Sequence, residues 1–197
     1  ALSIDCSFNR IQFTSDMLPA DILGISMLNP STQQFEFREG PIFASIVLAD
    51  EINRTPPKTQ SALLEAMSEF HITVNGKTRP LPKPFMVLAT QNPIEYEGTY
   101  TLPEAQLDRF LLRISMGYPG EDDELRIMRR HHPQPHLDAL IPALTGDDVV
   151  MLQNAAVMIP VEESVARYML DIVNATREHP GIRLGASPRA SLAFYES

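Results

Sequence analysis

The chain has 197 residues, of which 44% are apolar and 21% charged, and a formal net charge of −9 at pH 7. These proportions are typical of a soluble globular protein, and no run approaches the ~18 apolar residues of a membrane span. The acidic balance disfavours a nucleic-acid binder that works through a broad basic face. The single cysteine, Cys6, excludes an internal disulfide and fits a reducing compartment, which favours a cytoplasmic location.

The first 90 residues alternate between strand-like and helix-like patterns. Short apolar or alternating runs predict strands, and the Asn75-Gly76 pair between two of them predicts a β-hairpin turn. The predicted strands cover 8–13, 34–38, 46–50, 71–74, 77–79 and 84–90. We expect 46–50 and 84–90, which are almost wholly apolar, to be buried on both faces of a parallel sheet. A helical turn is expected over 18–23, and a longer helix opens at Thr55-Pro56, with Thr55 as its N-cap.

The pattern changes in the second half of the chain. A third buried strand is expected over 110–116 and a helix over 121–130, after which a proline-rich linker covers 131–143. Beyond the linker only helices are predicted: one capped by Thr145 and ending near 157, one over 161–178, and one capped by Ser187. Alternating strands and helices indicate a parallel sheet flanked by helices. We therefore expect an α/β domain in residues 1–136 and part of an all-α domain in residues 137–197.

Polar side chains stand where two of the predicted strands end. Asp50 and Glu51 close the strand 46–50, and Asn92 follows the strand 84–90. Open α/β sheets bind ligands at the carboxyl ends of their strands. One carboxylate there can hold Mg²⁺ through waters while its neighbour polarises an attacking water, and an amide on the next strand can contact the same water. Alternatively, the acid pair is a solvated strand end and Asn92 begins an ordinary turn.

Two arginines are further candidates. Arg109 lies between a short helix and the predicted strand 110–116, where it can reach a nucleotide on a neighbouring subunit; the alternative is an ion pair with Asp108 or Glu104. Arg189 lies in the first turn of a predicted helix, where the helix dipole disfavours a cation. A residue placed against local preference points to function, although an ordinary surface arginine remains the alternative.

The order and spacing of these features resemble the AAA+ ATPases, and most closely the MoxR family, from about residue 10 to residue 190. The segment 48–54 (LADEINR) is similar to the family's Walker B motif, and 89–93 (ATQNP) is similar to sensor 1. Further along, 102–110 (LPEAQLDRF) resembles the arginine-finger segment, and 185–190 (GASPRA) resembles sensor 2. The hairpin around Asn75-Gly76 matches the one before sensor 1, and 34–43 matches the family's insert in helix 2.

The resemblance implies a role for each matched residue. Asp50 would order Mg²⁺, Glu51 would be the general base, and Asn92 would position the attacking water. Arg109 would reach the γ-phosphate of ATP bound to the neighbouring subunit, and Arg189 would sense the nucleotide from the helical lid. The family forms rings, often hexamers, and its work is chaperone-like: remodelling or maturation of client proteins, often beside proteins with von Willebrand factor A domains.

The chain departs from the family at one point. The phosphate loop, Gly-x-x-x-x-Gly-Lys-Thr/Ser, should precede the first strand, and the chain begins too late to contain it. The segment 76–78 (GKT) is no substitute, because His71 stands where the first glycine should be and the prolines within 80–84 forbid the helix that must follow. We therefore expect a truncated piece that also lacks the last lid helices and binds ATP poorly by itself, although the full-length protein would bind it.

Two other readings of the sequence stay open. The chain could be a non-hydrolysing module that only assembles with, or inhibits, intact subunits; a phosphate loop encoded in frame upstream would reject a natural fragment of that kind. It could also belong to a related AAA+ machine, such as a magnesium-chelatase subunit or a helicase of the minichromosome-maintenance type. The acidic balance makes nucleic acid an unexpected partner, and salt-dependent DNA binding by the full-length protein would revive the helicase.

Overall fold

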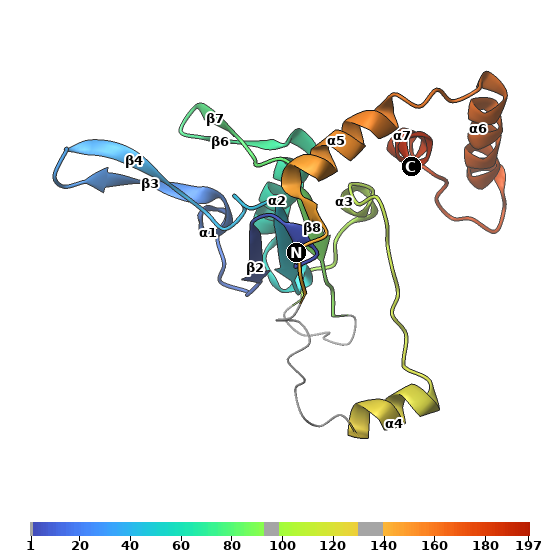
Figure 1. Cartoon of the computed structure of the whole chain (residues 1–197), viewed down its shortest axis with the longest axis horizontal. Helices are drawn as coiled ribbons and strands as arrows, with labels where there is room; N and C mark the ends of the chain where they lie inside the picture. The colour runs from blue at the N-terminus through green and yellow to red at the C-terminus, as the bar shows by residue number, and fades with distance from the viewer. Residues whose placement is uncertain (1, 93–98, 130–139) are drawn as a thin grey trace.

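The computed structural model describes residues 2–92, 99–129 and 140–197. At its centre is a three-stranded parallel sheet in the order β2–β5–β8 (Figure 1). Strand β2 covers Phe8–Gln12, β5 covers Ile46–Asp50 and β8 covers Met86–Ala89. Phe8, Ile46 and Met86 lie side by side in the register, so all three strands end at the same edge of the sheet.

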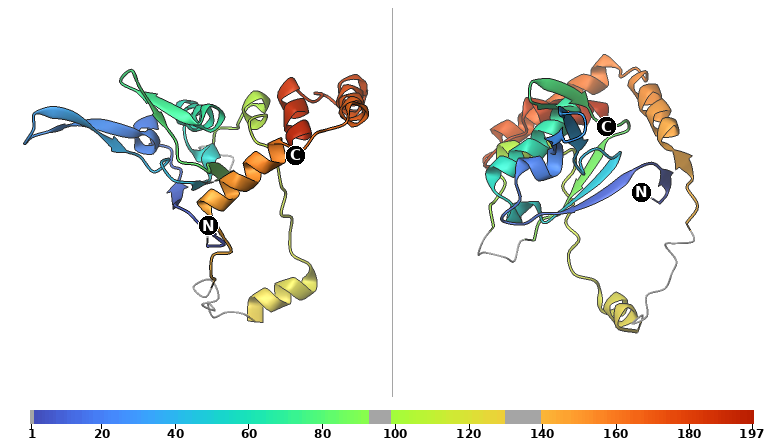
Figure 2. Two further views of the ribbon diagram at one scale, coloured as in Figure 1. Left: turned by 45° about the horizontal axis from the view of Figure 1, so that its top comes forward. Right: turned by 90° about the vertical axis from the view of Figure 1, so that its left-hand side faces the viewer.

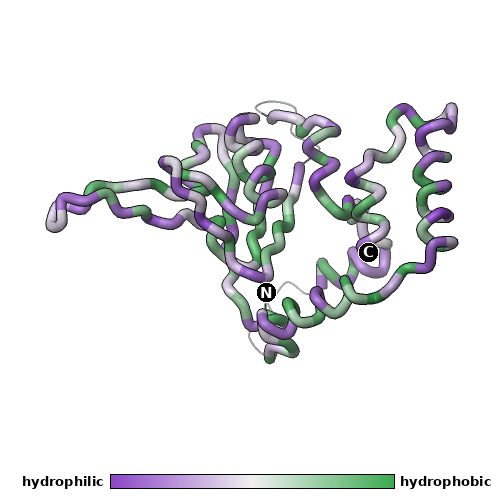
Figure 3. Tube along the Cα trace, turned by 90° about the horizontal axis from the view of Figure 1, so that it is seen from above, coloured by the Kyte–Doolittle hydropathy of each residue, from purple (hydrophilic) through white to green (hydrophobic). Residues whose placement is uncertain are grey.

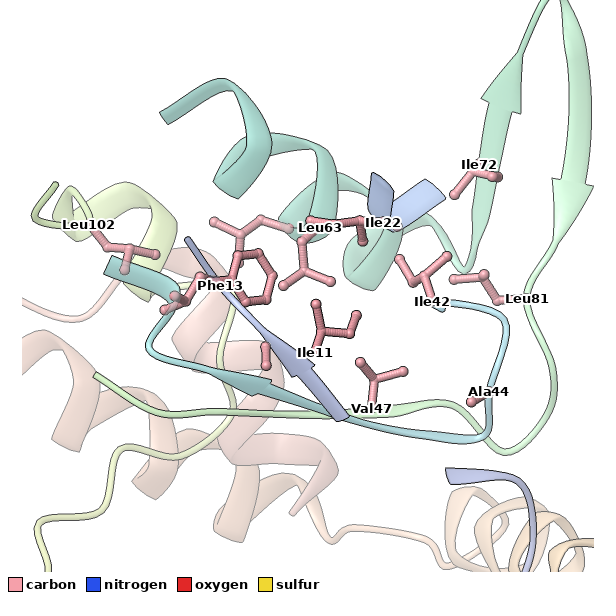
Figure 4. Close-up of a cluster of buried hydrophobic side chains, with 14 residues drawn as sticks. Ile11, Phe13, Ile22, Ile42, Ala44, Val47, Leu63, Ile72, Leu81 and Leu102 are labelled. Carbon is pink, nitrogen blue, oxygen red and sulfur yellow. The ribbon is translucent and has the colours of Figure 1, made fainter. Parts of the chain in front are cut away.

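One face of this sheet builds the hydrophobic core. Helices α1 (Pro19–Leu23) and α2 (Pro57–Glu69) supply residues that pack against it. Val47 and Leu63 are fully buried, and Figure 4 draws them in one cluster with Ile11, Phe13 and Ile22. Burying apolar side chains of this size contributes roughly 1.5–3 kcal/mol each. The packing of this core against the sheet therefore fixes the carboxyl ends of β2, β5 and β8.

The other face of the sheet is more open than the sequence suggests. Met86 and Leu88 of β8 are 53% and 48% exposed. The prediction that 84–90 is buried on both faces is therefore wrong, whereas the strand itself is confirmed at Met86–Ala89. An apolar run specifies a strand, but burial of its second face depends on a covering element that the run does not encode.

Two antiparallel hairpins extend from the core. Strands β3 (Gly24–Asn29) and β4 (Gln34–Glu39) form the longer one, which reaches furthest from the body in Figure 3. Strands β6 (His71–Val74) and β7 (Lys77–Pro80) form the other. Asn75 and Gly76 have φ values of 52° and 70° in its two-residue turn, as a type I′ turn requires. The predicted hairpin is confirmed, and the segment 76–78 is part of it.

The C-terminal part of the described chain is helical, as predicted. Helices α5 (Gly146–Val157), α6 (Glu163–Glu178) and α7 (Pro188–Glu196) follow one another. The hydroxyl of Thr145 accepts a hydrogen bond from the Asp148 N–H, and that of Ser187 accepts one from the Ala190 N–H, so both predicted N-caps are confirmed. Figure 2 shows these helices curving around the side of the molecule away from the β3–β4 hairpin.

Shorter elements connect these parts. The 3₁₀ helix η1 (Ile52–Arg54) follows β5, α3 (Glu104–Leu107) precedes Arg109, and α4 (Glu121–Arg129) lies where a helix is predicted. Strand β1 (Ile4–Asp5) pairs in parallel with β9 (Leu144–Thr145). The predicted boundary between residues 136 and 137 and most of the linker 131–143 lie outside the described residues, so the division into two domains stays a prediction.

Two predictions from local pattern are wrong. The segment 110–116 is not a strand: it is irregular, and Leu112 and Ile114 are 74% and 78% exposed. A strand needs a neighbour for its N–H and C=O groups, and no strand of the described residues pairs with this segment. Thr55 does not cap α2: it closes η1, and α2 begins at Pro57 with Pro56 in the N-cap position. The fixed φ of Pro57 suits the first helical position.

Across the residues that the structure describes, no helix is both long and apolar enough to cross a membrane.

Candidate functional site

Asp50 ends β5 with its carboxylate held from both sides. Its Oδ1 accepts a hydrogen bond from the Thr90 hydroxyl at 2.5 Å, and its Oδ2 accepts one from Arg10 Nε at 3.1 Å. The Thr90 hydrogen bond, followed by that from Arg10, lowers the pKa of Asp50 below its ordinary value. The group is therefore ionised at neutral pH, and an ionised carboxylate is the oxygen donor that Mg²⁺ prefers.

Glu51 follows in an unusual backbone conformation. Its φ is 56° and its ψ is 49°, which is the left-handed region that side chains other than glycine rarely occupy. Its N–H donates to the Thr90 hydroxyl at 2.9 Å, and its Oε2 accepts from Gln12 Nε2 at 2.9 Å and Arg54 NH1 at 3.1 Å. This backbone conformation costs of order 1–3 kcal/mol, which the surrounding contacts must offset.

Asn53 fixes the segment that contains Asn92. The Asn53 side chain donates from Nδ2 to the Asn92 carbonyl at 3.1 Å and accepts at Oδ1 from the Asn92 N–H at 3.3 Å. One step earlier, the Ile52 N–H donates to the Thr90 carbonyl at 3.0 Å. Asn53 is 8% exposed, so this reciprocal pair is shielded from water. The ladder between β5 and β8 therefore continues through a side chain and sets Asn92 at a fixed position relative to Asp50.

The Arg109 side chain binds α2 in this structure. Its NH1 donates to the Leu64 carbonyl at 2.9 Å and to the Ser68 hydroxyl at 3.0 Å, both on α2. The alternative ion pair of Arg109 with Asp108 or Glu104 is absent from the described part of the chain, where those two acids face other arginines instead.

Arg189 approaches Asp108, with NH1 3.9 Å from Oδ2. The five residues singled out in the sequence thus fall into two groups. Asp50, Glu51 and Asn92 gather at one edge of the sheet, while Arg109 and Arg189 lie around the end of α3.

Five residues around the acid pair were missed as site residues from the sequence. They are Arg10, Gln12, Asn53, Arg54 and Thr90. A signal for the first two existed, because polar residues at alternate positions of a strand beside β5 share one face. The order of strands in the sheet, which would have turned that pattern into a contact, is a tertiary property.

The chain matches known proteins over its whole length. A family model described as "ATPase family associated with various cellular activities (AAA)" matches residues 1–112. The chain is 51% identical to the uncharacterised protein YeaC of Bacillus subtilis, an alignment that covers 100% of this chain and 62% of YeaC. It is 46% identical to Chaperone MoxR1 of Mycobacterium tuberculosis, covering 95% of this chain and 52% of that protein.

The fold is also found among solved structures. A candidate ATPase from Cytophaga hutchinsonii superposes with a TM-score of 0.85 at 41% identity, which covers 99% of this chain and 62% of that one. The chain thus spans between about half and two thirds of the length of these relatives, from 52% of MoxR1 to 62% of YeaC.

The family match and the superposition together define an AAA-type ATPase core, and the predicted α/β class is confirmed. Within that class the chain belongs to the MoxR family, as the resemblance in its motifs indicates.

Proposed function

We propose that the full-length protein hydrolyses ATP with the acid pair Asp50–Glu51 and uses the energy to remodel or mature client proteins. The observation that carries this proposal is the hydrogen-bonded junction between β5 and β8. There the Thr90 hydroxyl contacts both acids. Asn53, which lies three residues beyond Asp50, binds the backbone of Asn92. Charged and amide groups held at fixed positions at the end of a parallel sheet are what phosphoryl transfer to water requires.

In this proposal Asp50 holds Mg²⁺ and Glu51 moves the proton. Bound Mg²⁺ would neutralise charge on the β- and γ-phosphates of ATP. Glu51 would accept the proton of the water that attacks the γ-phosphorus, with ADP as the leaving group. In the described part of the chain, both hydrogen bonds to the Glu51 carboxylate are made to Oε2, which leaves Oε1 to accept that proton.

Three other residues complete the proposed site. Asn92 positions the attacking water, Arg109 contacts the γ-phosphate of a neighbouring subunit, and Arg189 senses nucleotide from the lid. Supporting this, Arg109 lies just after α3, and among the described contacts its guanidinium donates only through NH1, to two neutral acceptors on α2. A phosphate is a stronger partner for a guanidinium than a carbonyl or a hydroxyl.

A site completed by a neighbour's arginine needs an assembly. We propose a ring, with a hexamer as the expected size, built from a core in residues 1–136 and a lid in residues 137–197. The name of the relative Chaperone MoxR1 supports a chaperone-like role. Client proteins, among them proteins with von Willebrand factor A domains, would be handled in the cytoplasm.

The test is ATP turnover by the full-length gene product and its Glu51→Gln variant. Loss of a general base lowers kcat by about 10²–10⁴-fold. We expect a fall in that range with ATP affinity retained, because Gln keeps the size of the side chain and Asp50 still holds Mg²⁺. Glu36→Gln, an exposed acid on the β3–β4 hairpin, is the matched control and should leave turnover unchanged. Unchanged hydrolysis in the Glu51→Gln variant would remove Glu51 from the mechanism.

One observation favours a second candidate, a non-hydrolysing assembly module. Glu51 is engaged by Arg54 and Arg109 is tied to α2, so in this chain both side chains already have protein partners. A full-length protein that binds ATP, assembles and yet shows no turnover above that of its Glu51→Gln variant would favour the module.

A further inference from the structure

The start of α7 is joined to the end of α3 through one carboxylate. Asp108 directly follows α3 and precedes Arg109. Both of its oxygens lie within hydrogen-bond distance of the Ser187 hydroxyl, Oδ1 at 2.7 Å and Oδ2 at 2.8 Å. Arg189 NH1 lies 3.9 Å from Oδ2. A single acid therefore contacts both the cap of α7 and the arginine in its first turn.

Ser187 uses its hydroxyl in two directions. Its hydroxyl donates to Asp108 and accepts from the Ala190 N–H at 3.0 Å, which caps α7. The negative charge of Asp108 is therefore placed one hydroxyl away from the positive end of the helix dipole. The same charge partly offsets the unfavourable position of Arg189 in the first turn.

The segment before α7 is fixed to α6. Arg177 Nε donates to the Ala186 carbonyl at 2.9 Å, and the Ala186 N–H donates to the Thr176 hydroxyl at 2.9 Å. Gly185 packs so closely that a Cβ there would lie 2.5 Å from the Cα of Arg177. Helices α6 and α7 are therefore held as one unit, and the position of Asp108 sets how that unit meets the core.

On the other side of Asp108, the adjacent residue is tied to the core. Arg109 donates to Leu64 and Ser68 of α2. Arg183 and Glu104, 3.7 Å apart, add a second and more exposed link between α3 and the loop before α7. Two consecutive residues, Asp108 and Arg109, thus bind the helical unit and the core respectively.

We propose that Asp108 is a positioning residue that holds the start of α7 against α3 and competes with nucleotide phosphate for Arg189. The inference rests on the proposed function, because it takes Arg189 to be a nucleotide-binding group. When the Arg189 guanidinium binds a phosphate, it leaves the Asp108 carboxylate. Ser187 keeps its hydrogen bond to Asp108.

The decisive variant is Asp108→Asn in the full-length protein, with Mg-ATP binding measured by calorimetry. Asn keeps an oxygen that accepts from Ser187 and removes only the charge that attracts Arg189. For a partly exposed ion pair we expect ATP to bind about two- to fivefold more tightly. The gain must disappear in the Arg189→Ala background, because without the arginine there is nothing left to compete for.

Ser187→Thr and Ser187→Ala separate positioning from charge. Thr retains the cap and the hydroxyl, whereas Ala loses both and keeps the Asp108 charge. In the nucleotide-free protein we expect faster amide hydrogen exchange over α7 in the Ala variant and near wild-type exchange in the Thr variant. ATP binding in the Ala variant should not become tighter.

The outcomes distinguish the two proposals. Tighter binding in Asp108→Asn that persists in the Arg189→Ala background, or no change in binding at all, overturns the competition and leaves the proposed function standing. A wild-type full-length protein that binds no Mg-ATP overturns both. Unchanged exchange over α7 in the Ser187→Ala variant overturns the positioning role.

Discussion

Thr90 contacts both members of the acid pair with a single hydroxyl. It donates to the Asp50 carboxylate and accepts from the backbone N–H of Glu51, so one side chain fixes both acids. Its own N–H and carbonyl bond to Ala49 and Ile52, which places that hydroxyl firmly. A threonine at the end of β8 is therefore as much a part of the site as the acids themselves.

Thr90→Val should raise the pKa of Asp50 toward its ordinary value, because the largest cause of its lowering is removed while Arg10 remains. A carboxyl whose pKa is lower in the folded than in the unfolded state stabilises the fold above its unfolded pKa, about 3.9. That contribution is lost as the pH falls through the folded pKa. The free-energy difference between wild type and Thr90→Val should therefore be larger at neutral pH than at acid pH.

The measurement is an NMR titration of the Asp50 carboxyl carbon together with denaturant unfolding across the same pH range. Thr73→Val serves as the matched control, because Thr73 is a strand threonine whose hydroxyl contacts only Thr78 among the described hydrogen bonds. A Thr90→Val variant with an unaltered Asp50 titration would contradict the assigned cause.

At the scale of elements, the two hairpins are joined to each other as well as to the core. The Arg79 guanidinium lies 3.9 Å over the ring of Phe37, and Asn75 Nδ2 donates to the Ser26 hydroxyl at 2.9 Å. Phe37 also packs edge-on against Phe43, at the base of the longer hairpin. A displacement of β6–β7 is therefore transmitted to β3–β4 through specific side chains.

Replacing Arg79 with Met should loosen the longer hairpin without unfolding the sheet. Met keeps apolar contact with Phe37 but loses the attraction of cation and ring, worth about 0.5–2 kcal/mol. We expect faster amide exchange over Gly24–Glu39 and unchanged exchange in β5. Lys77→Met on the same hairpin is the control, because Lys77 lies at the turn and is exposed. Equal exchange in both variants would show that Arg79 does not join the hairpins.

At the scale of the molecule, short sequence patterns predicted correctly the features that neighbouring residues determine. The Asn75-Gly76 turn and the Thr145 and Ser187 caps are confirmed because each depends on a few neighbouring residues, and strand β5 is confirmed with β2 and β8 beside it. The segment 110–116 failed because an apolar run becomes a strand only beside a partner strand.

The contacts within the site could not be predicted from the sequence pattern. Asp108 and Ser187 are 79 residues apart, and Arg10 is 40 residues from Asp50. Their motifs could be identified by resemblance, but nothing in either segment specifies which residue of the other it meets. Long-range pairings of this kind follow from strand order and helix packing, which the fold decides.

The whole chain predicts a contrast in nucleotide binding. No Gly-x-x-x-x-Gly-Lys-Thr/Ser motif occurs in its 197 residues, and the segment 76–78 is part of a β-hairpin. A net charge of −9 and two carboxylates at the strand ends repel a triphosphate unless cationic and N–H groups offset them. By calorimetry we therefore expect these 197 residues alone to bind Mg-ATP at least about 100-fold more weakly than the full-length gene product. Asp50→Asn in the full-length protein should weaken Mg-ATP but not ATP without magnesium, because its carboxylate acts through the cation. Equal affinity of the 197-residue chain and the full-length gene product for Mg-ATP would mean that these 197 residues hold the nucleotide. Arg109 and Arg189 would then be the candidates for its phosphate contacts.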